Sequence, residues 1–333
     1  MIIMHTSRII IHKMNAIAIY RECTVKKVFI DGKAGTTGLR IYERLEGRGD
    51  ITLLTLSDDD RKDTALRRSM LNSADIAFLC LPDAAAIEAV QMVENPDTVV
   101  IDTSTAHRTA PGWIYGFPEL SPEIRSAIPH AKRIAVPGCH AGGFIALVRP
   151  LIESGAIAKN ARLTCHSITG YSGGGKKMIA EYEDTERSPL LGAPRQYGLT
   201  QNHKHLREMK AVTGLEHEPI FCPIVADFYS GMEVTVPLFA EDLAPGFTAD
   251  SIREIYKSKY TGPIVTFDSP DESAMLPAAG QSGLDSMKIA VLGNSERILL
   301  TALYDNLGKG ASGAAVEIMN IVLGVPETTG LSL

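Results

Sequence analysis

Short apolar runs alternate with segments of helical periodicity along the first part of the chain. Strands are expected at 26–31, 51–56, 76–81 and 99–102, and helices at 37–45 and 83–93. An apolar run without polar alternation is typical of a strand buried on both faces, as in parallel sheets. Strands and helices in this order predict an α/β fold, a Rossmann-like doubly wound parallel sheet.

The pattern changes after Cys139, where the expected strands are longer and several alternate polar with apolar side chains. They cover 162–169, 219–227, 233–239, 288–292 and 298–304. Such alternation indicates an antiparallel sheet with one face in the core and the other toward solvent. Small and apolar residues recur at helical spacing over 310–323, which predicts a helix that packs back on the first domain.

These patterns divide the chain of 333 residues into domains. Residues 1–24 lack a clear apolar core and a small-residue cleavage site, and we interpret them as an N-terminal extension or the result of an upstream start site; a weak targeting sequence is the alternative. The first domain is expected at 25–138 and is completed by a C-terminal helix within 310–333. A second, α+β domain is expected at 139–309.

Composition narrows the possible partners and the cellular compartment. A net charge of −6 argues against a nucleic-acid partner, and no apolar run is long enough to span a membrane. The five cysteines are odd in number and widely spaced, and none forms a Cys-x-x-Cys pair. This usage is typical of a reducing compartment, so a cytoplasmic protein is expected.

The first expected strand ends in the glycine-rich run Asp31-Gly32-Lys33-Ala34-Gly35-Thr36-Thr37-Gly38. Glycines at a strand-to-helix turn let the backbone approach a pyrophosphate, and the helix N-terminus offers N–H donors to it. The spacing departs from Gly-x-Gly-x-x-Gly because Ala34 takes the middle small position. The run therefore predicts a dinucleotide-binding turn, with a simple turn as the alternative.

The end of the second expected strand decides between the two nicotinamide cofactors. It reads Ser57-Asp58-Asp59-Asp60-Arg61-Lys62, which contains signals for both. Acidic groups favour the free 2′-hydroxyl of NAD, whereas Ser57, Arg61 and Lys62 favour the 2′-phosphate of NADP. We expect NADP; the alternative is that these charges form only a solvated loop.

One cysteine stands at a position suited to chemistry. In Ala135-Val136-Pro137-Gly138-Cys139-His140 an apolar run gives way to an amphipathic segment, so Cys139 is expected where a strand turns into a helix. The positive end of a helix dipole stabilises a thiolate, which would lower the pKa of Cys139 and make it nucleophilic. A buried structural cysteine is the alternative.

A set of short segments is more specific than any one of them. It comprises 32–38, Leu81-Pro82-Asp83, 102–108, Tyr115-Gly116-Phe117-Pro118-Glu119, Pro137-Gly138-Cys139, 170–176 and Asn202-His203-Lys204-His205. In order and spacing the set resembles the N-acetyl-γ-glutamyl-phosphate reductase family of arginine biosynthesis, in its shorter second type. The resemblance runs from about Val25 to the segment 306–313. It departs at Phe117, where leucine is expected, at His140, where tyrosine is common, and over residues 1–24, which have no counterpart.

The resemblance implies a fold of the semialdehyde dehydrogenase kind, with an NADP-binding domain and a catalytic and dimerisation domain. It implies that Cys139 attacks the γ-acyl phosphate of a small-molecule substrate, forms a thioester and expels phosphate, and that NADPH then reduces the thioester to an aldehyde. It also implies a cofactor contact at Pro82 and a homo-oligomer, either a dimer or a tetramer.

The reduction also needs an acid–base group, and the pair His203 and His205 supplies the candidates. The resemblance places this role on His205. Glu208 lies three residues later, on the same face if the segment is helical, where it could orient the His205 ring. His203 would then orient the substrate. A metal site of two histidines is the rival, but no third ligand lies at a convincing spacing.

The substrate implied by the resemblance carries a phosphate and a carboxylate, which basic and hydroxyl groups must bind. Arg108 is the main candidate because a guanidinium binds such anions through two hydrogen bonds. Ser172 and Lys176, in the glycine-rich segment 170–176, are weaker candidates because that segment can be a simple turn. Glu119 is expected to stabilise a loop near the site without a chemical role.

Two kinds of alternative remain open at this stage. Aspartate-semialdehyde dehydrogenases share the fold, the cysteine and the acyl-phosphate chemistry, and reductases of aminoadipate-type or carrier-bound acyl phosphates share still more. The His-x-His pair and Tyr-Gly-Phe-Pro-Glu favour the acetylglutamyl enzyme over the first of these. A non-catalytic NADP-binding regulator is the other kind, and the intact Cys139, His205 and Arg108 argue against it.

Overall fold

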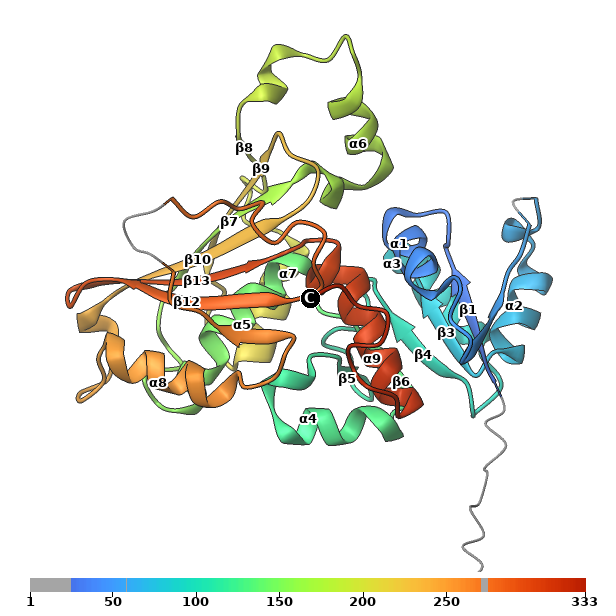
Figure 1. Ribbon diagram of the computed structural model, residues 1–333, viewed down its shortest axis with the longest axis horizontal. Helices are drawn as coiled ribbons and strands as arrows, with labels where there is room; N and C mark the ends of the chain where they lie inside the picture. The colour runs from blue at the N-terminus through green and yellow to red at the C-terminus, as the bar shows by residue number, and fades with distance from the viewer. Residues whose placement is uncertain (1–24, 58, 271–274) are drawn as a thin grey trace, which may run out of the picture.

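The computed structural model describes residues 25–57, 59–270 and 275–333. The extension expected at residues 1–24 lies outside the described residues. Two sheets organise the described part of the chain, and Figure 1 shows them side by side with helix α9 (Gly313–Leu323) between them. No helix among the described residues is long and apolar enough to cross a membrane.

The first sheet is parallel throughout, as the sequence pattern predicts. Its order is β2 (Ile51–Leu54), β1 (Lys26–Asp31), β3 (Ile76–Leu79), β4 (Val99–Asp102), β6 (Arg133–Ala135) and β5 (Ile114–Tyr115). Successive side chains of β1 enter opposite layers because a strand alternates its faces. Val28 and Ile30 pack with α1 (Thr36–Leu45) and α9, whereas Phe29 packs with α2 (Thr64–Ser73) and α3 (Asp83–Met92).

The C-terminal helix packs on the first sheet, which confirms the expectation for 310–323. Ala315, Ile318 and Met319 of α9 are fully buried in the same core as strands β1, β3 and β4. The helix begins later than expected because a π-helical turn, η7 (Gly308–Ser312), precedes it. Such turns are rare and occur mostly at functional sites.

The second sheet is mixed, so the expectation of a purely antiparallel sheet is wrong. Its order is β11 (Val265–Phe267), β12 (Met287–Gly293), β13 (Arg297–Tyr304), β10 (Met232–Phe239), β7 (Thr164–Gly170), β9 (Ile220–Ala226) and β8 (Arg195–Gln196). β7 pairs with β9 in parallel, as does β11 with β12. Both strands of a parallel pair can alternate polar and apolar residues, so alternation alone did not reveal their direction.

Helices cover one face of this second sheet. The central helix is α5 (Cys139–Glu153), which is almost wholly buried and packs against β10, β13, α7 (Lys204–Thr213) and α8 (Ala249–Lys259). The remaining helices and single turns are α4 (Pro122–Ala127), α6 (Gly175–Glu183), η1 (Asp60–Lys62), η2 (Pro118–Leu120), η3 (Ile128–His130), η4 (Tyr171–Gly174), η5 (Pro189–Gly192) and η6 (Ala240–Asp242). The N-termini of α1, α5 and α7 bring the predicted site residues together.

Candidate active site

Cys139 is the first residue of α5, directly after the turn that leaves β6. The expected strand-to-helix position is therefore confirmed, and the side chain is half-buried. The buried Tyr304 hydroxyl fixes this turn, because it donates to the Cys139 carbonyl and accepts from the Gly143 N–H at 3.1 Å.

The expectation of a lowered thiol pKa is wrong in this structure. Burial raises the pKa of Cys139 to about 11, although the Arg108 guanidinium and the backbone N–H groups at the start of α5 act in the opposite direction. Removal of water disfavours the charged form of a thiol more than the helix end stabilises it here. The thiol is therefore protonated at neutral pH and needs a base before it can attack.

Gly138 is the point at which three functional side chains converge. A β-carbon at this position would lie 2.3 Å from Arg108 Nη1, 2.5 Å from His205 Nε2 and 2.8 Å from Glu208 Oε2. A side chain at position 138 would therefore displace the ends of Arg108, His205 and Glu208 from their positions beside Cys139. Glycine lets these three groups approach the turn.

Glu208 does not orient His205, contrary to expectation, although both residues are on α7. One of its oxygens accepts from the Gly138 N–H and the Tyr115 hydroxyl, each at 2.8 Å, and the other accepts from Arg108 at 2.9 Å. Every one of these partners lies outside α7. Glu208 instead joins the Cys139 turn to Arg108, and local helical spacing could not reveal that.

His205 is buried and electrically neutral. Its Nδ1 is buried and has no hydrogen-bond partner among the described residues. Burial lowers its pKa well below the usual value, and the nearby Arg108 guanidinium lowers it further. The neutral ring can accept a proton, and its Nε2 points to the turn beside Cys139.

His203 caps the helix that carries His205. Its Nδ1 accepts a hydrogen bond from the His205 N–H at 3.3 Å, and the two rings pack edge to face with centroids 4.7 Å apart. The ring also packs against His140, whose Nε2 lies 2.6 Å from the Tyr197 hydroxyl and whose Nδ1 lies 2.6 Å from Ser167 Oγ. These contacts fix His203 at the edge of the reaction centre.

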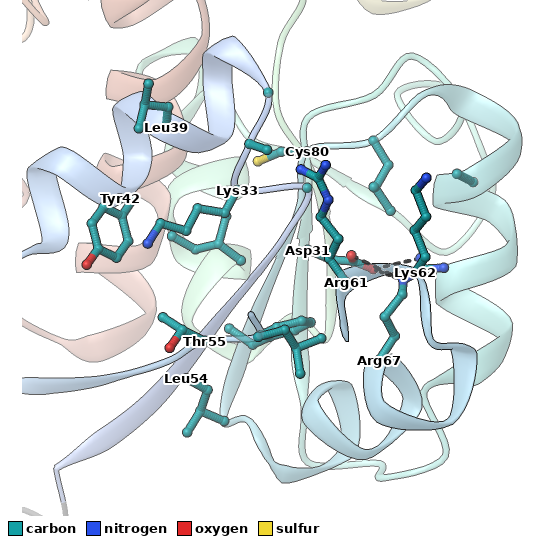
Figure 2. Close-up of a pocket in the computed structure, with 18 of the residues that line it drawn as sticks. Asp31, Lys33, Leu39, Tyr42, Leu54, Thr55, Arg61, Lys62, Arg67 and Cys80 are labelled. Atoms are coloured by element: carbon teal, nitrogen blue, oxygen red, sulfur yellow. Dashed lines mark hydrogen bonds and ion pairs between the residues drawn. The ribbon is translucent and has the colours of Figure 1, made fainter. Parts of the chain in front are cut away.

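A first cavity of about 820 Å³, here called the nucleotide cavity, lies at the ends of β1, β2 and β3. Figure 2 shows Arg61, Lys62 and Arg67 on one side of it and Lys33 and Tyr42 on the other. Its lining contains most of the predicted cofactor residues, namely Gly32, Gly35, Arg61, Lys62 and Pro82.

The glycine-rich turn beside this cavity has the close backbone approach that the sequence predicted. Gly32 has a φ of +88°, and a β-carbon on it would lie 2.3 Å from the Cys80 carbonyl oxygen. A β-carbon on Gly38 would lie 2.4 Å from the Gly32 carbonyl oxygen. The N-terminus of α1 carries no side-chain cap, so its N–H groups remain open to an anion.

Two residues of this region differ from expectation. Ser57 is exposed and does not line the nucleotide cavity; its hydroxyl donates to Asp60 at 2.6 Å. Arg67, which sequence reasoning missed, lines the cavity and pairs with Asp31 at 2.8 Å. Nothing in the sequence distinguishes Arg67 from other arginines of an amphipathic helix.

A second cavity of about 300 Å³, the thiol cavity, adjoins the first. The two share Gly35, Cys80 and Leu81 in their lining, so they lie next to each other. The thiol cavity also brings together predicted residues from separate elements, namely Thr36, Thr37, Arg108, Cys139, Ser172 and His205. Sequence reasoning assigned no role to Thr103, Asn306, Leu307, Gly310 and Ala311, which complete its wall.

A third cavity of about 290 Å³, the histidine cavity, is also lined by Cys139. Its lining includes Cys139, His140, Tyr197, His203 and His205. Lys176 lines none of the three cavities and is exposed on α6, so the structure gives no support for its predicted substrate contact. Within the described ranges no group of His, Cys, Asp and Glu side chains could hold a metal ion.

Comparisons with known proteins agree with this arrangement. Two family models match, the semialdehyde dehydrogenase NAD binding domain over residues 55–127 and the semialdehyde dehydrogenase dimerisation domain over residues 139–306. The second match begins at Cys139, the residue at which the strand pattern changes.

Curated relatives carry a more specific name. An N-acetyl-γ-glutamyl-phosphate reductase of Rhizobium meliloti is 47% identical over 305 residues, which cover 89% of this chain and 98% of the relative. This chain belongs to the N-acetyl-γ-glutamyl-phosphate reductase family. N-acetyl-γ-glutamyl-phosphate reductase 2 of Nostoc is 43% identical over 92% of this chain and 99% of its own length.

Solved structures of aspartate semialdehyde dehydrogenases share the fold of this family member. The Vibrio cholerae enzyme II superposes with a TM-score of 0.68 at 16% identity, covering 90% of this chain and 98% of that one. The Francisella tularensis enzyme superposes with a TM-score of 0.67 at 13% identity, covering 89% of this chain and 99% of that one. The expected fold of the semialdehyde dehydrogenase kind is confirmed.

Proposed function

We propose that this protein uses NADPH to reduce N-acetyl-γ-glutamyl phosphate to N-acetylglutamate 5-semialdehyde and phosphate in arginine biosynthesis, through a thioester on Cys139. The observation that carries the proposal is the position of Cys139, which lines a cavity that adjoins the nucleotide cavity and another cavity lined by His203 and His205. The 47% identity to a named reductase supports the choice of substrate.

The residues of the nucleotide cavity fit NADP. Gly32, Gly35 and Gly38 would let the pyrophosphate approach the backbone at the N-terminus of α1, with Thr36 and Thr37 in its first turn. Pro82 would contact the nucleotide, and Arg61 and Lys62 would pair with the 2′-phosphate. When bound, NADPH would supply the hydride that reduces the thioester.

His205 would act as the base that takes the Cys139 proton, because its ring is neutral and faces the same cavities as the thiol. The thiolate would attack the γ-acyl carbon, and the carbon–oxygen bond to phosphate would break. After reduction, the protonated His205 would return its proton to the hemithioacetal oxygen. Collapse of that adduct would release the aldehyde and regenerate the Cys139 thiol, because the hydroxyl proton passes to the sulfur as the carbon–sulfur bond breaks.

Arg108 would provide the positive charge next to the reacting group. Its guanidinium is buried and donates to Glu208 and to the carbonyls of Thr103 and Val136, so its orientation is fixed. Charge fixed in advance stabilises a developing oxyanion without reorganisation. Glu208 would hold Arg108 and the Cys139 turn, while His203 and Ser172 would contact the substrate.

The open face of the second sheet supports a homo-oligomer. Alternate side chains of β10 and β13 point away from the helices, and among them Phe239 is 63% and Leu299 is 41% exposed. The same face also carries Glu233, Thr235 and Arg297, and such a mixture of apolar and polar groups is typical of a subunit interface. We propose a cytoplasmic dimer or tetramer that is joined through this face.

A panel of semialdehydes, assayed in the reverse direction of the reaction, tests the function directly. Phosphate-dependent reduction of NADP should occur with N-acetylglutamate semialdehyde, and with aspartate or aminoadipate semialdehyde at less than about one hundredth of that efficiency. Equal or greater efficiency with either of the latter would overturn the substrate assignment. NADP binding without turnover of any semialdehyde would favour the non-catalytic regulator.

A further inference from the structure

The π-helical turn η7 forms part of the wall beside the reactive thiol. Leu307, Gly310 and Ala311 line the thiol cavity. A β-carbon on Gly310 would lie 3.2 Å from the Cys139 β-carbon, so the backbone of η7 is in direct contact with the start of α5. A small shift of this turn would therefore change the space next to the sulfur.

The Lys309 side chain of η7 is buried outside the thiol cavity, between two glutamates. Its ammonium lies 2.6 Å from Glu119 Oε1 and 2.5 Å from Glu317 Oε2, and the Phe117 ring centroid is 4.8 Å away. The exposed fractions of the three charged side chains are 3%, 7% and 1%. We call these residues the lysine cluster.

The lysine cluster joins three separate parts of the chain. Glu119 belongs to η2 in the first domain, Lys309 to η7, and Glu317 to α9. Both η2 and η7 also contact α5. The cluster therefore ties the turn beside Cys139 to the first domain on one side and to the C-terminal helix on the other.

The lysine cluster has no net charge when one of its two carboxyl groups carries a proton. Glu119 and Glu317 each retain a buried oxygen without a partner among the described residues. Burial and the charge of Glu119 raise the pKa of Glu317 to about 8. The buried Tyr260 is the other titratable group that faces Glu119. At neutral pH the cluster then contains an ammonium, a carboxylate and a carboxylic acid.

Stability alone does not explain such a cluster. Removing charges from water is so unfavourable that apolar residues of similar volume often stabilise a protein as well or better. Directed hydrogen bonds, however, fix a backbone more narrowly than apolar contacts do, since apolar packing has no preferred direction. The cluster is better suited to fixing the position of η7 than to adding free energy of folding.

We propose that Lys309 is a positioning residue, which holds η7 in the conformation that shapes the thiol cavity for the nicotinamide end of the cofactor. This inference rests on the proposed function. Lys309 itself lines none of the three cavities. It acts through Leu307 and Gly310, which line the thiol cavity. Its loss should therefore affect the reaction step more than the binding of the adenosine end, which lies in the nucleotide cavity.

The test uses the variant Lys309→Met and the charge-balanced variant Lys309→Met/Glu119→Gln, with Glu317→Gln as the matched control. We expect kcat to fall about 10- to 100-fold in both Lys309 variants, because displacements of about 1 Å are sufficient for such losses. NADPH affinity, measured by fluorescence titration, should change less than about threefold. Glu317→Gln, which imitates the protonated acid, should stay within about threefold in kcat.

Alkylation of Cys139 gives a readout that does not depend on the acyl substrate. NADP should slow the reaction of iodoacetamide with Cys139 in the wild-type protein, as followed by peptide mass spectrometry, and this protection should be lost in the Lys309 variants. If the wild type does not turn over the acyl phosphate but shows this pattern, only the proposed function fails.

Several outcomes would overturn the positioning role. These are an unchanged kcat, a loss confined to KM, or retained protection in a folded Lys309 variant. If Lys309→Met does not fold, the charge-balanced variant decides, because it leaves no unpaired charge in the core. Failure of both to fold would make the cluster a folding determinant and would refute the proposal.

Discussion

The nucleotide cavity and the thiol cavity adjoin each other, but they are built in opposite ways. The nucleotide cavity is lined by residues between Phe29 and Ala85, a continuous strand–helix run. The residues that line the thiol cavity are spread along the chain from Gly35 to Ala311. This cavity therefore forms only when the elements around both sheets have packed together. A cofactor site can thus follow from local folding, whereas this reaction centre depends on the whole fold.

The two cavities also differ in electrostatics. Lysine and arginine side chains line the nucleotide cavity and face a region open to solvent. The cation of the thiol cavity, Arg108, is already paired with Glu208, and the ring of His205 is neutral. The first cavity is suited to hold a charged ligand, and the second to move protons.

The largest expected effect is the loss of turnover, without loss of cofactor affinity, when Cys139 is replaced. Cys139→Ala should reduce turnover by at least about 10⁴-fold, because the nucleophile is lost. NADPH affinity should remain unchanged, since Cys139 does not line the nucleotide cavity. Steady-state assays and fluorescence titration measure the two quantities. Full activity in this variant would refute the thioester mechanism.

The next effect distinguishes two neighbouring histidines at the thiol. His205→Asn should lower kcat by about 10²- to 10⁴-fold, the usual contribution of a positioned proton-transfer group. His203→Asn should act mainly through KM, because an orienting contact is made in ground and transition states alike. Kinetics and pH profiles of the phosphate-dependent reverse reaction check both. The titration of the base should lie below the ordinary histidine pKa, because burial lowers the pKa of both rings. Loss of this titration in His203→Asn and its retention in His205→Asn would reverse the roles.

A smaller effect concerns the edge of the nucleotide cavity. Replacing both Arg61 and Lys62 by alanine should lower the preference for NADPH over NADH by about 1–3 kcal/mol, the range for hydrogen bonds to charged groups. The ratio of kcat/KM for the two cofactors measures this preference. Lys176→Ala, on exposed α6, is the matched charge control and should not alter the ratio. An unchanged ratio in the double variant would assign Arg61 and Lys62 to a solvated loop.

The smallest expected effect is on the pH dependence of the free energy of unfolding, through Glu317 of the lysine cluster. The pKa of Glu317 is raised from its ordinary 4.5 to about 8, so the folded protein binds a proton that the unfolded chain lacks between these values. Stability contributed by this group is complete below about pH 4.5 and is lost as pH rises to 8. The slope is at most about 1.4 kcal/mol per pH unit. Urea unfolding between pH 6 and 8 should show a shallower dependence in Glu317→Gln, and equal slopes would contradict the shared proton.

The sequence predicts those features that depend on neighbours along the chain. The uninterrupted apolar run Val28, Phe29 and Ile30 indicates two buried faces, and the position of Cys139 after β6 follows from the change of pattern. The glycine turn is predicted for the same reason, because Gly32 and Gly35 lie in the single turn that joins β1 to α1 and Gly38 lies in the first turn of α1. Its close approach to Cys80, which follows β3, is a longer-range contact.

Features that depend on distant pairing could not be predicted in this way. Glu208 has the right spacing for His205, yet its carboxylate meets Arg108 and Tyr115, which are 100 and 93 residues away in sequence. The thiol pKa likewise depends on burial by both domains and not on the helix end alone. Spacing along α7 carries no information on either effect.

Cys139 lines both the thiol cavity and the histidine cavity, and this has a consequence for the order of events in a catalytic cycle. In the proposed mechanism the sulfur would receive the acyl group from the histidine cavity and face the nicotinamide from the thiol cavity. The acyl carbon then needs no large movement between the two half-reactions. The aldehyde can also leave through the side by which the acyl phosphate entered, while the oxidised cofactor is still in place. Product inhibition studies should accordingly show aldehyde release before NADP release.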